Sequence, residues 1–184
     1  MRSKCHYGVV DDSINAFLAE ARRYCLLVED SAPLSSWMFA WECLSQVLRL
    51  YEMALHLPEV EPERGDLLPS ISHETWQALR DHVGRKLSRD YYWDIFEPLE
   101  KEKPEPVVGS ISDDLADIWR DVKPGIAEID AGRATSPNEA VWHWRSSFET
   151  HWGRHAAGAV VALHSLCFGQ FADASRPPAA STGR

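Results

Sequence analysis

The sequence predicts an all-α fold, a bundle of about five main helices that ends in a long C-terminal helix. Apolar residues recur at steps of three and four in five separate segments, which is the period of one helix face. The alternating pattern of a half-buried strand and the glycine-rich loop of a phosphate site are both missing from the sequence. We expect residues 1–172 to form a single helical domain. Residues 173–184 are rich in Ala, Ser and Pro and are expected to be a disordered tail.

The 184-residue chain has a globular composition, with 45% hydrophobic and 26% charged residues. A net charge of -9 repels both nucleic-acid phosphates and anionic membranes, so we expect neither as a partner. The four cysteines form no C-x-x-C pair. Cys25, Cys43 and Cys167 lie in apolar runs, which is typical of free thiols in a reducing compartment. Because the sequence shows no secretory signal and no apolar run of membrane-spanning length, we expect a cytoplasmic location.

The first helix is expected after a short leader over residues 1–10. Asp12 or Ser13 is a suitable N-cap, and Pro33 closes the helix or the loop that follows it. The apolar face of this helix is predicted to hold Ile14, Phe17, Leu18, Ala21, Cys25 and Val28.

The second and third helices also begin at serine caps. Ser35 or Ser36 is expected to cap a helix over residues 37–56, and its few polar positions indicate a central place in the bundle. Ser72 is expected to cap a third helix that ends at about residue 87.

Two segments between the third and fourth helices are harder to assign. Residues 89–98 are aromatic, and we expect a turn of helix whose rings dock on the core. Residues 101–109 are charged and contain prolines, so we expect a surface loop.

The fourth helix is expected to begin at a cap formed by Ser110 or Ser112. Pro124 falls inside its continuing apolar pattern and is expected to kink it, because proline removes one backbone hydrogen bond. Gly132 is the predicted stop.

The fifth helix has the clearest start, at Ser136-Pro-Asn-Glu139, and is expected to continue to about Phe168. We expect Ser136 to be its N-cap and three of its residues to be buried, namely Phe148, Trp152 and Ala159. Gly153 and Gly158, together with several alanines, are expected to let another helix approach closely.

Several segments of the C-terminal half resemble one bacterial family. They are Asp113–Asp121, Val141–Ala156 and Ala162–His164, with Tyr91–Pro98 as a further similar stretch. The family is known as domain of unknown function 5063, and the run Phe148–His155 is the most specific part of the resemblance. The resemblance implies a helical bacterial protein without an assigned activity, and it supplies no catalytic residue.

The strongest candidate site is the pair His151 and His155, which lie four residues apart on one predicted helix face. Neutral imidazole is a common ligand of zinc, nickel and iron, and His56 is a candidate third ligand. One histidine plus a later His-x-x-x-His is similar to the spacing in DinB-like metal proteins. In the alternative interpretation the histidines bond to carboxylates and pack against aromatic neighbours, which are Trp144, Phe148 and Trp152.

The carboxylates Asp114, Asp117 and Asp121 step along one face of the fourth predicted helix. With the histidine pair they could complete a metal site of the kind found inside helical bundles. Alternatively, they favour the positive end of the helix dipole, face water or pair with arginines. The arginines concerned are Arg120, Arg145 and Arg154.

A third pattern is Arg145 followed by His151, which matches the loose Arg-x(4-6)-His motif of HEPN ribonucleases. Six helical steps of about 100° place these side chains on different faces of a straight helix, and the acidic charge disfavours an RNA substrate. Trp142 points away from the main aromatic stripe of the fifth helix and is a candidate contact surface.

These observations favour a non-enzymatic cytoplasmic helical module that acts through a protein partner or self-association, without a cofactor. The alternative is a metal-dependent helical-bundle enzyme that uses His151 and His155 with a divalent transition metal. A HEPN-like ribonuclease is the third possibility.

Overall fold

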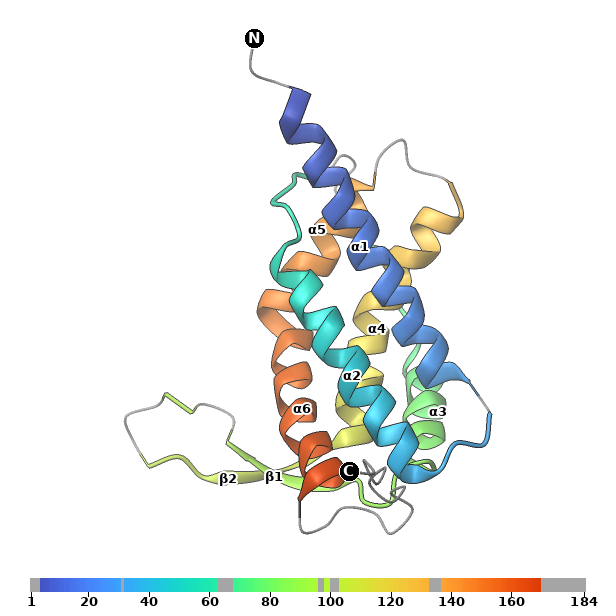
Figure 1. The fold of residues 1–184 in the computed structure, drawn as a ribbon, viewed down its shortest axis with the longest axis vertical. Helices are drawn as coiled ribbons and strands as arrows, with labels where there is room; N and C mark the ends of the chain where they lie inside the picture. The colour runs from blue at the N-terminus through green and yellow to red at the C-terminus, as the bar shows by residue number, and fades with distance from the viewer. Residues whose placement is uncertain are drawn as a thin grey trace, which may run out of the picture.

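A computed structural model describes residues 4–30, 32–62, 68–95, 98–99, 103–132 and 137–169, with side chains from residue 12 onward. The main helices lie side by side in a bundle, and a β-hairpin projects from one end (Figure 1). The expected tail at 173–184 and the expected cap Ser136 lie outside the described residues. Within the described part of the chain, no helix combines the length and the apolar character needed to cross a membrane.

The first three helices are α1 (Lys4–Glu29), α2 (Ser36–Leu55) and α3 (His73–Gly84). The expected leader is wrong, because α1 already begins at Lys4. Residues 4–11 contain no proline, and a single glycine such as Gly8 costs a helix only about 1 kcal/mol. The predicted caps Ser35 and Ser72 are confirmed, since each side-chain oxygen accepts a hydrogen bond from the backbone N–H three residues later.

Helix α4 (Ile111–Asp130) is part of the bundle and carries the predicted row of carboxylates, which are Asp114, Asp117 and Asp121. Ser110 caps it by accepting a hydrogen bond from the N–H of Asp113 at 3.2 Å. The helix continues through Pro124, and Gly132, with a φ of 59°, follows its end as predicted. That positive φ is the left-handed conformation that glycine adopts without strain.

The long C-terminal helix consists of α5 (Asn138–Ser147), a π-helical turn η1 (Phe148–Trp152) and α6 (Gly153–Phe168). The turn is π-helical because the N–H of Gly153 donates a hydrogen bond to the carbonyl oxygen of Phe148, five residues earlier. A Cβ at position 153 would overlap that carbonyl oxygen, so this glycine serves the turn rather than a neighbouring helix. Trp152 and Ala159 are buried as predicted, whereas Phe148 is only partly buried and contacts Tyr51 edge-on.

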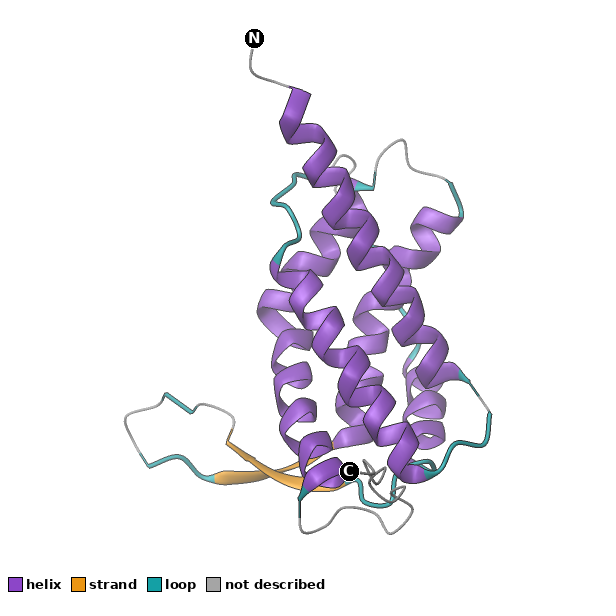
Figure 2. Cartoon of the chain, in the orientation of Figure 1, coloured by secondary structure: helices purple, strands orange, loops and turns teal. Residues whose placement is uncertain are grey.

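Strands β1 (Tyr91–Ile95) and β2 (Pro106–Ser110) form an antiparallel hairpin in which Trp93 pairs with Val108 (Figure 2). The expected helical turn and surface loop are therefore wrong in these segments. Aromatic and β-branched residues fit a pleated strand, and alternate side chains point to opposite faces. Of the three aromatic residues of β1, Tyr92 docks on the bundle, whereas the side chains of Tyr91 and Trp93 are about three-quarters exposed, at 76% and 75%.

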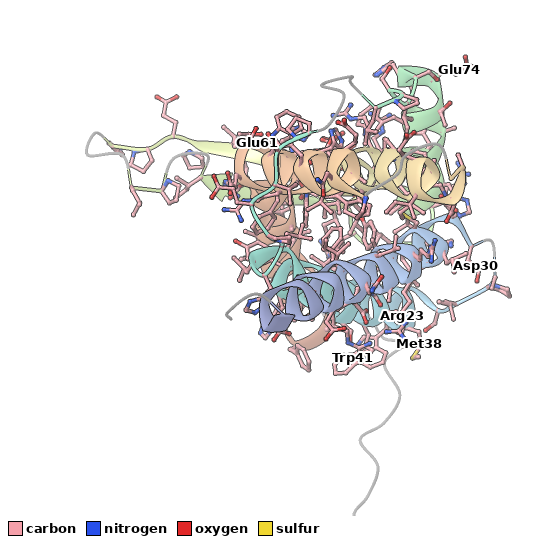
Figure 3. All side chains as sticks on the ribbon, turned by 90° about the horizontal axis from the view of Figure 1, so that it is seen from above. Arg23, Asp30, Met38, Trp41, Glu61 and Glu74 are labelled. Atoms are coloured by element: carbon pink, nitrogen blue, oxygen red, sulfur yellow. The ribbon has the colours of Figure 1, made fainter. Side chains whose placement is uncertain are left out.

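The core lies where α1, α2, α3, α4 and the C-terminal helices meet, and side chains fill the space between the ribbons (Figure 3). Phe17 packs against Trp144 with ring centroids 4.9 Å apart. The hydroxyl of buried Tyr24 donates a hydrogen bond to the carbonyl oxygen of Leu115 at 2.6 Å. The first contact joins α1 to α5 and the second joins α1 to α4, which also packs against α6.

Candidate metal centre

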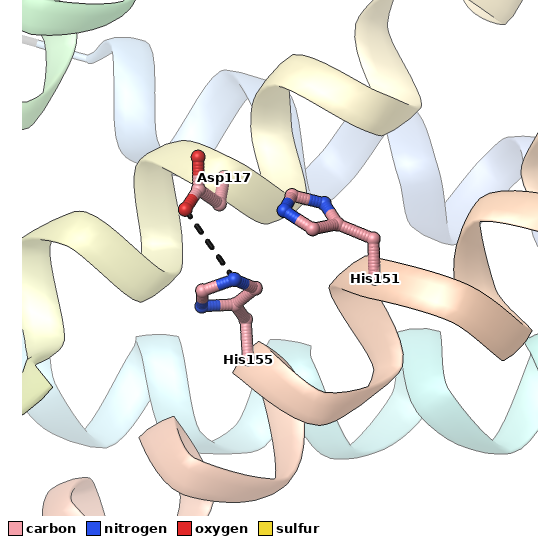
Figure 4. A group of neighbouring side chains, drawn as sticks. All are labelled: Asp117, His151 and His155. Atoms are coloured by element: carbon pink, nitrogen blue, oxygen red, sulfur yellow. Dashed lines mark ion pairs between the residues drawn. The ribbon is translucent and has the colours of Figure 1, made fainter. Parts of the chain in front are cut away.

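Helices α4 and α6 bring the two predicted groups of site residues together. The carboxylates of α4 repeat at steps of three and four residues, so they share one helix face. His151 lies in the π-helical turn, one residue before its end, and His155 lies in the first turn of α6. Both imidazoles are directed at α4, and Asp117 of that helix lies next to the two rings (Figure 4).

Asp117, His151 and His155 each offer one ligand atom, and these three atoms lie within 4.8 Å of one another. Nε2 of His155 lies 3.4 Å from Oδ2 of Asp117. Asp117 is buried with 6% exposure, whereas the imidazole of His151 is 40% exposed. The cluster therefore has a buried anionic side and a side that reaches solvent.

The other nitrogen of each imidazole has its own carboxylate. Nδ1 of His151 lies 2.7 Å from Oδ2 of Asp121, and Nδ1 of His155 lies 2.8 Å from Oδ1 of Asp114. An ionised carboxylate only accepts hydrogen bonds, so these contacts place the proton on Nδ1. Each neutral ring then keeps the lone pair of Nε2 for a ligand. This arrangement, a carboxylate behind each histidine, is the one that orients metal-binding imidazoles.

Asp117 is held from its other side by Arg120. Oδ1 of Asp117 lies 2.7 Å from Nη2 of Arg120, whose guanidinium also lies over the ring of Trp76. This Oδ1 atom is buried and, within the described part of the chain, accepts no well-oriented hydrogen bond. The ion pair compensates part of the cost of burying the Asp117 carboxylate, while Oδ2 is directed at the histidines.

Burial and the neighbouring charged or hydrogen-bonding groups shift the pKa values of His155 and Asp114 in opposite directions. Burial alone lowers the pKa of His155, but the hydrogen bond with Asp114 and the negative charges of Asp117 and Asp114 raise it above its ordinary value. Burial raises the pKa of Asp114, although the hydrogen bonds from His155 and Tyr92 favour its ionised form. For His155 the effect of the neighbouring carboxylates therefore outweighs the effect of burial.

Residues 9–169 match the family described as Domain of unknown function (DUF5063). The chain belongs to this family. The crystal structure of protein BF1032 from Bacteroides fragilis is similar to this DUF5063 fold, with a TM-score of 0.74 and 24% sequence identity. The similarity covers 92% of this chain and 99% of that one, and at this identity it shows the fold. No curated protein matches the chain.

Three other predicted residues of this DUF5063 protein lie apart from the cluster. His56 is exposed at the C-terminal end of α2, where its backbone N–H bonds to the last turn of that helix, and the candidate third ligand beside the histidine pair is Asp117 of α4. Arg145 donates to the carbonyl oxygen of Leu57 and pairs with Glu149, whereas its predicted HEPN partner His151 is bonded to Asp121. Trp142 is partly exposed, as expected.

Proposed function

We propose that this DUF5063 protein binds one divalent transition-metal ion between α4 and α6. Its ligands would be Oδ2 of Asp117 and Nε2 of His151 and His155. The supporting observation is that a separate carboxylate occupies Nδ1 of each histidine, which leaves both Nε2 atoms directed at Asp117. Imidazole nitrogen combined with carboxylate oxygen is a ligand set used by zinc, iron, nickel and manganese.

The geometry requires a small closure around the ion. Ligands at about 2.0–2.2 Å from one metal are roughly 3.0–3.5 Å from each other. Nε2 of His155 and Oδ2 of Asp117 already have this spacing at 3.4 Å, whereas the three atoms as a group are spread over up to 4.8 Å. His151 can supply this movement, because its ring is 40% exposed and is not locked in the core.

Three protein ligands leave coordination positions open, as in catalytic rather than structural metal sites. A bound ion would supply Lewis-acid chemistry at the exposed side of the cluster, by polarising a substrate oxygen or activating water. The chain itself would orient the ligands through Asp114 and Asp121.

The test is metal content and affinity. The protein should be purified without a nickel column, analysed for bound metals, stripped, and titrated with Zn²⁺ and Co²⁺. We expect one equivalent of metal in the wild type. Loss of a residue that only orients a ligand, such as Asp114, weakens metal binding roughly 10–100-fold. Asp117→Asn and His155→Ala remove a ligand itself, so each should weaken binding by more than this.

Two histidines provide matched controls for these variants. His164 is exposed on the same helix α6, and His56 is exposed at the end of α2. His164→Ala and His56→Ala should bind metal as the wild type does. Equal affinity in the wild type and His155→Ala, with both proteins folded by circular dichroism, would refute the proposed ligand set.

A second candidate function is a protein-interaction module, and the outer face of the hairpin favours it. The strand register places Tyr91, Trp93, Ile95 and Val108 on this face, and all four are exposed. We propose a second copy of the chain as the occupant. Large aromatic side chains bury about 150–250 Å² each, so two such faces would bury on the order of 1,000 Å², near the lower limit for a specific interface.

Analytical ultracentrifugation tests this second proposal. The wild type should form a dimer at micromolar to millimolar concentrations, and Trp93→Ser should remain a monomer. Trp142→Ser, which changes an exposed tryptophan of α5, is the control and should dimerise. A wild-type protein that stays monomeric across this concentration range would exclude the second copy as the occupant.

A further inference from the structure

The hairpin reaches the histidine cluster through one side chain of its inner face. The hydroxyl of Tyr92 donates a hydrogen bond to Oδ2 of Asp114 at 2.7 Å. Oδ1 of the same carboxylate lies 2.8 Å from Nδ1 of His155. A continuous chain of hydrogen bonds therefore runs from β1 through α4 to one of the proposed metal ligands.

Two glycines make room for the ring of Tyr92. A Cβ on Gly109 of β2 would lie 2.6 Å from Cζ of Tyr92, and a Cβ on Gly158 of α6 would overlap its hydroxyl oxygen. No side chain larger than hydrogen fits at either position while the tyrosine is in place. Burial, together with the hydrogen bond to Asp114, raises the pKa of Tyr92, so its hydroxyl remains a proton donor.

A second inner-face contact holds the hairpin without involving the histidine cluster. Nη2 of Arg154 donates to Oδ2 of Asp94 at 2.6 Å and to the carbonyl oxygen of Ile95 at 2.8 Å. Asp94 therefore offers a comparison, because its contact attaches the same strand to α6 and does not include Asp114 of α4.

We propose that Tyr92 is a positioning residue of the metal centre, and that hairpin docking and metal binding strengthen each other through Asp114 and His155. This inference rests on the proposed metal-binding function. When the hairpin is docked, Asp114 holds His155 with Nδ1 protonated and Nε2 directed at Asp117. A metal ion on Nε2 fixes the same tautomer and so favours the docked hairpin. The coupling is reciprocal, as for any two linked equilibria.

Removal of the tyrosine hydroxyl should affect the site more than the fold. Tyr92→Phe keeps the ring between the two glycines but leaves Oδ2 of Asp114 without its donor. The carboxylate then orients His155 less tightly, and outer partners of metal-binding histidines contribute about 10–100-fold to affinity. Tyr92 is one contact further from the metal than Asp114, so we expect the dissociation constant for Zn²⁺ to rise several-fold, up to about tenfold, in this variant.

The experiment combines Zn²⁺ titration against a competing chelator with hydrogen exchange of the full-length protein. In the wild type, Zn²⁺ should slow amide exchange in residues 91–95 and 106–110. In Tyr92→Phe, binding should be weaker and the hairpin amides should no longer respond to saturating Zn²⁺. In Asp94→Asn, the hairpin should exchange faster overall, but Zn²⁺ should still slow it.

Two further measurements separate positioning from a loss of structure. The nitrogen chemical shifts of His155 should report a protonated Nδ1 in the wild type and in Asp94→Asn, and a mixture of tautomers in Tyr92→Phe. Gly158→Ala, which displaces the hydroxyl sterically, should weaken Zn²⁺ binding as Tyr92→Phe does.

The outcomes distinguish this inference from the proposed function. If the wild type binds Zn²⁺, but Tyr92→Phe binds it equally well and the hairpin exchange ignores the metal, Tyr92 is not a positioning residue. If the wild type binds no Zn²⁺, the proposed function itself is overturned, and the coupling with it.

Discussion

The indole of Trp144 lies so close to Gly125 that a Cβ on this glycine would be 2.5 Å from Cε2 and Nε1 of the ring. The same Nε1 donates a hydrogen bond to the carbonyl oxygen of Val122 at 2.9 Å. Trp144 is completely buried, so the ring has no room to withdraw. Helices α4 and α5 therefore meet at a contact that only glycine permits.

Substitution of Gly125 by alanine should destabilise the protein. The added methyl group must displace a buried tryptophan, and overpacking of this kind costs about 1–3 kcal/mol. Gly84→Ala is the matched control, because a Cβ there would meet Oγ of Ser112 at an ordinary 3.5 Å. Urea unfolding should show a lower midpoint for Gly125→Ala and no decrease for Gly84→Ala. Equal midpoints for Gly125→Ala and the wild type would mean that the indole can shift.

Truncation of Trp152 should be among the most damaging single changes. Its side chain is fully buried, lies beside Phe148 and donates from Nε1 to the carbonyl oxygen of Trp144. We expect Trp152→Ala to lower the free energy of unfolding by about 3–5 kcal/mol, the usual cost of removing a large buried aromatic side chain. In thermal melts, Trp152→Ala should unfold at a clearly lower temperature than Trp142→Ala, because the side chain of Trp142 is partly exposed.

The cysteine thiols of the core should resist modification in the folded protein. Cys25, Cys43 and Cys167 are buried, and burial raises the pKa of Cys25 from 9.0 to about 12. Burial also raises the pKa of Cys43. A rise of three pKa units lowers the thiolate fraction about 1000-fold, since only the thiolate reacts. In a Cys5→Ser background, a disulfide reagent at pH 8 should label these thiols only after guanidinium unfolding. Rapid labelling of native Cys25 would contradict its burial.

The raised pKa of His155 predicts a pH dependence for the metal-free protein. A histidine whose pKa is higher in the folded state than in the unfolded state stabilises the fold fully below the unfolded value, which is about 6.5. This contribution is lost as the pH rises through the folded value. Stability measured by urea unfolding should therefore fall less steeply above pH 6.5 in His155→Gln than in the wild type. A parallel course of the two curves would show that His155 has no raised pKa.

Metal affinity should rise over the pH range in which the stability contributed by His155 to the metal-free protein falls. A protonated imidazole cannot bind a cation, so Zn²⁺ must displace the proton of His155. Affinity should increase as the pH rises from 6 to 8. Calorimetry in buffers with different ionisation enthalpies should detect proton release, and a pH-independent affinity would exclude His155 as a ligand.

Much of the helical framework follows from local sequence signals. Ser35, Ser72 and Ser110 act as caps because their side chains satisfy N–H groups that no helix can satisfy internally. The pair His151 and His155 was likewise predictable from helical spacing alone. Such signals act within one turn of the chain, which is why they can be recognised without knowledge of the fold.

The residue that completes the cluster, Asp117, could not be identified from such local signals. Periodicity places Asp117 and His56 on helices but does not say which helix faces α6. The hairpin was missed for a related reason. Its strands are joined by residues 96–105 rather than by a two-residue turn, so the usual local hairpin signal is missing. Tyr92 could therefore not be connected with Asp114 from the sequence.

The π-helical turn Phe148–Trp152 holds one residue more than an α-helical turn of nearly the same rotation, because its hydrogen bond joins residues five apart instead of four. The turn therefore absorbs the extra residue without rotating α5 relative to α6, and Trp144 and His155 keep the orientation that a continuous α-helix would give them. Deletion of one exposed residue of the turn, such as Thr150, should leave a continuous α-helix and preserve the contact of Trp144 with α4. Insertion of one residue into the regular part of α6 before His155 would instead rotate His155 by about 100° relative to Trp144, and should abolish either the core contact or the histidine cluster.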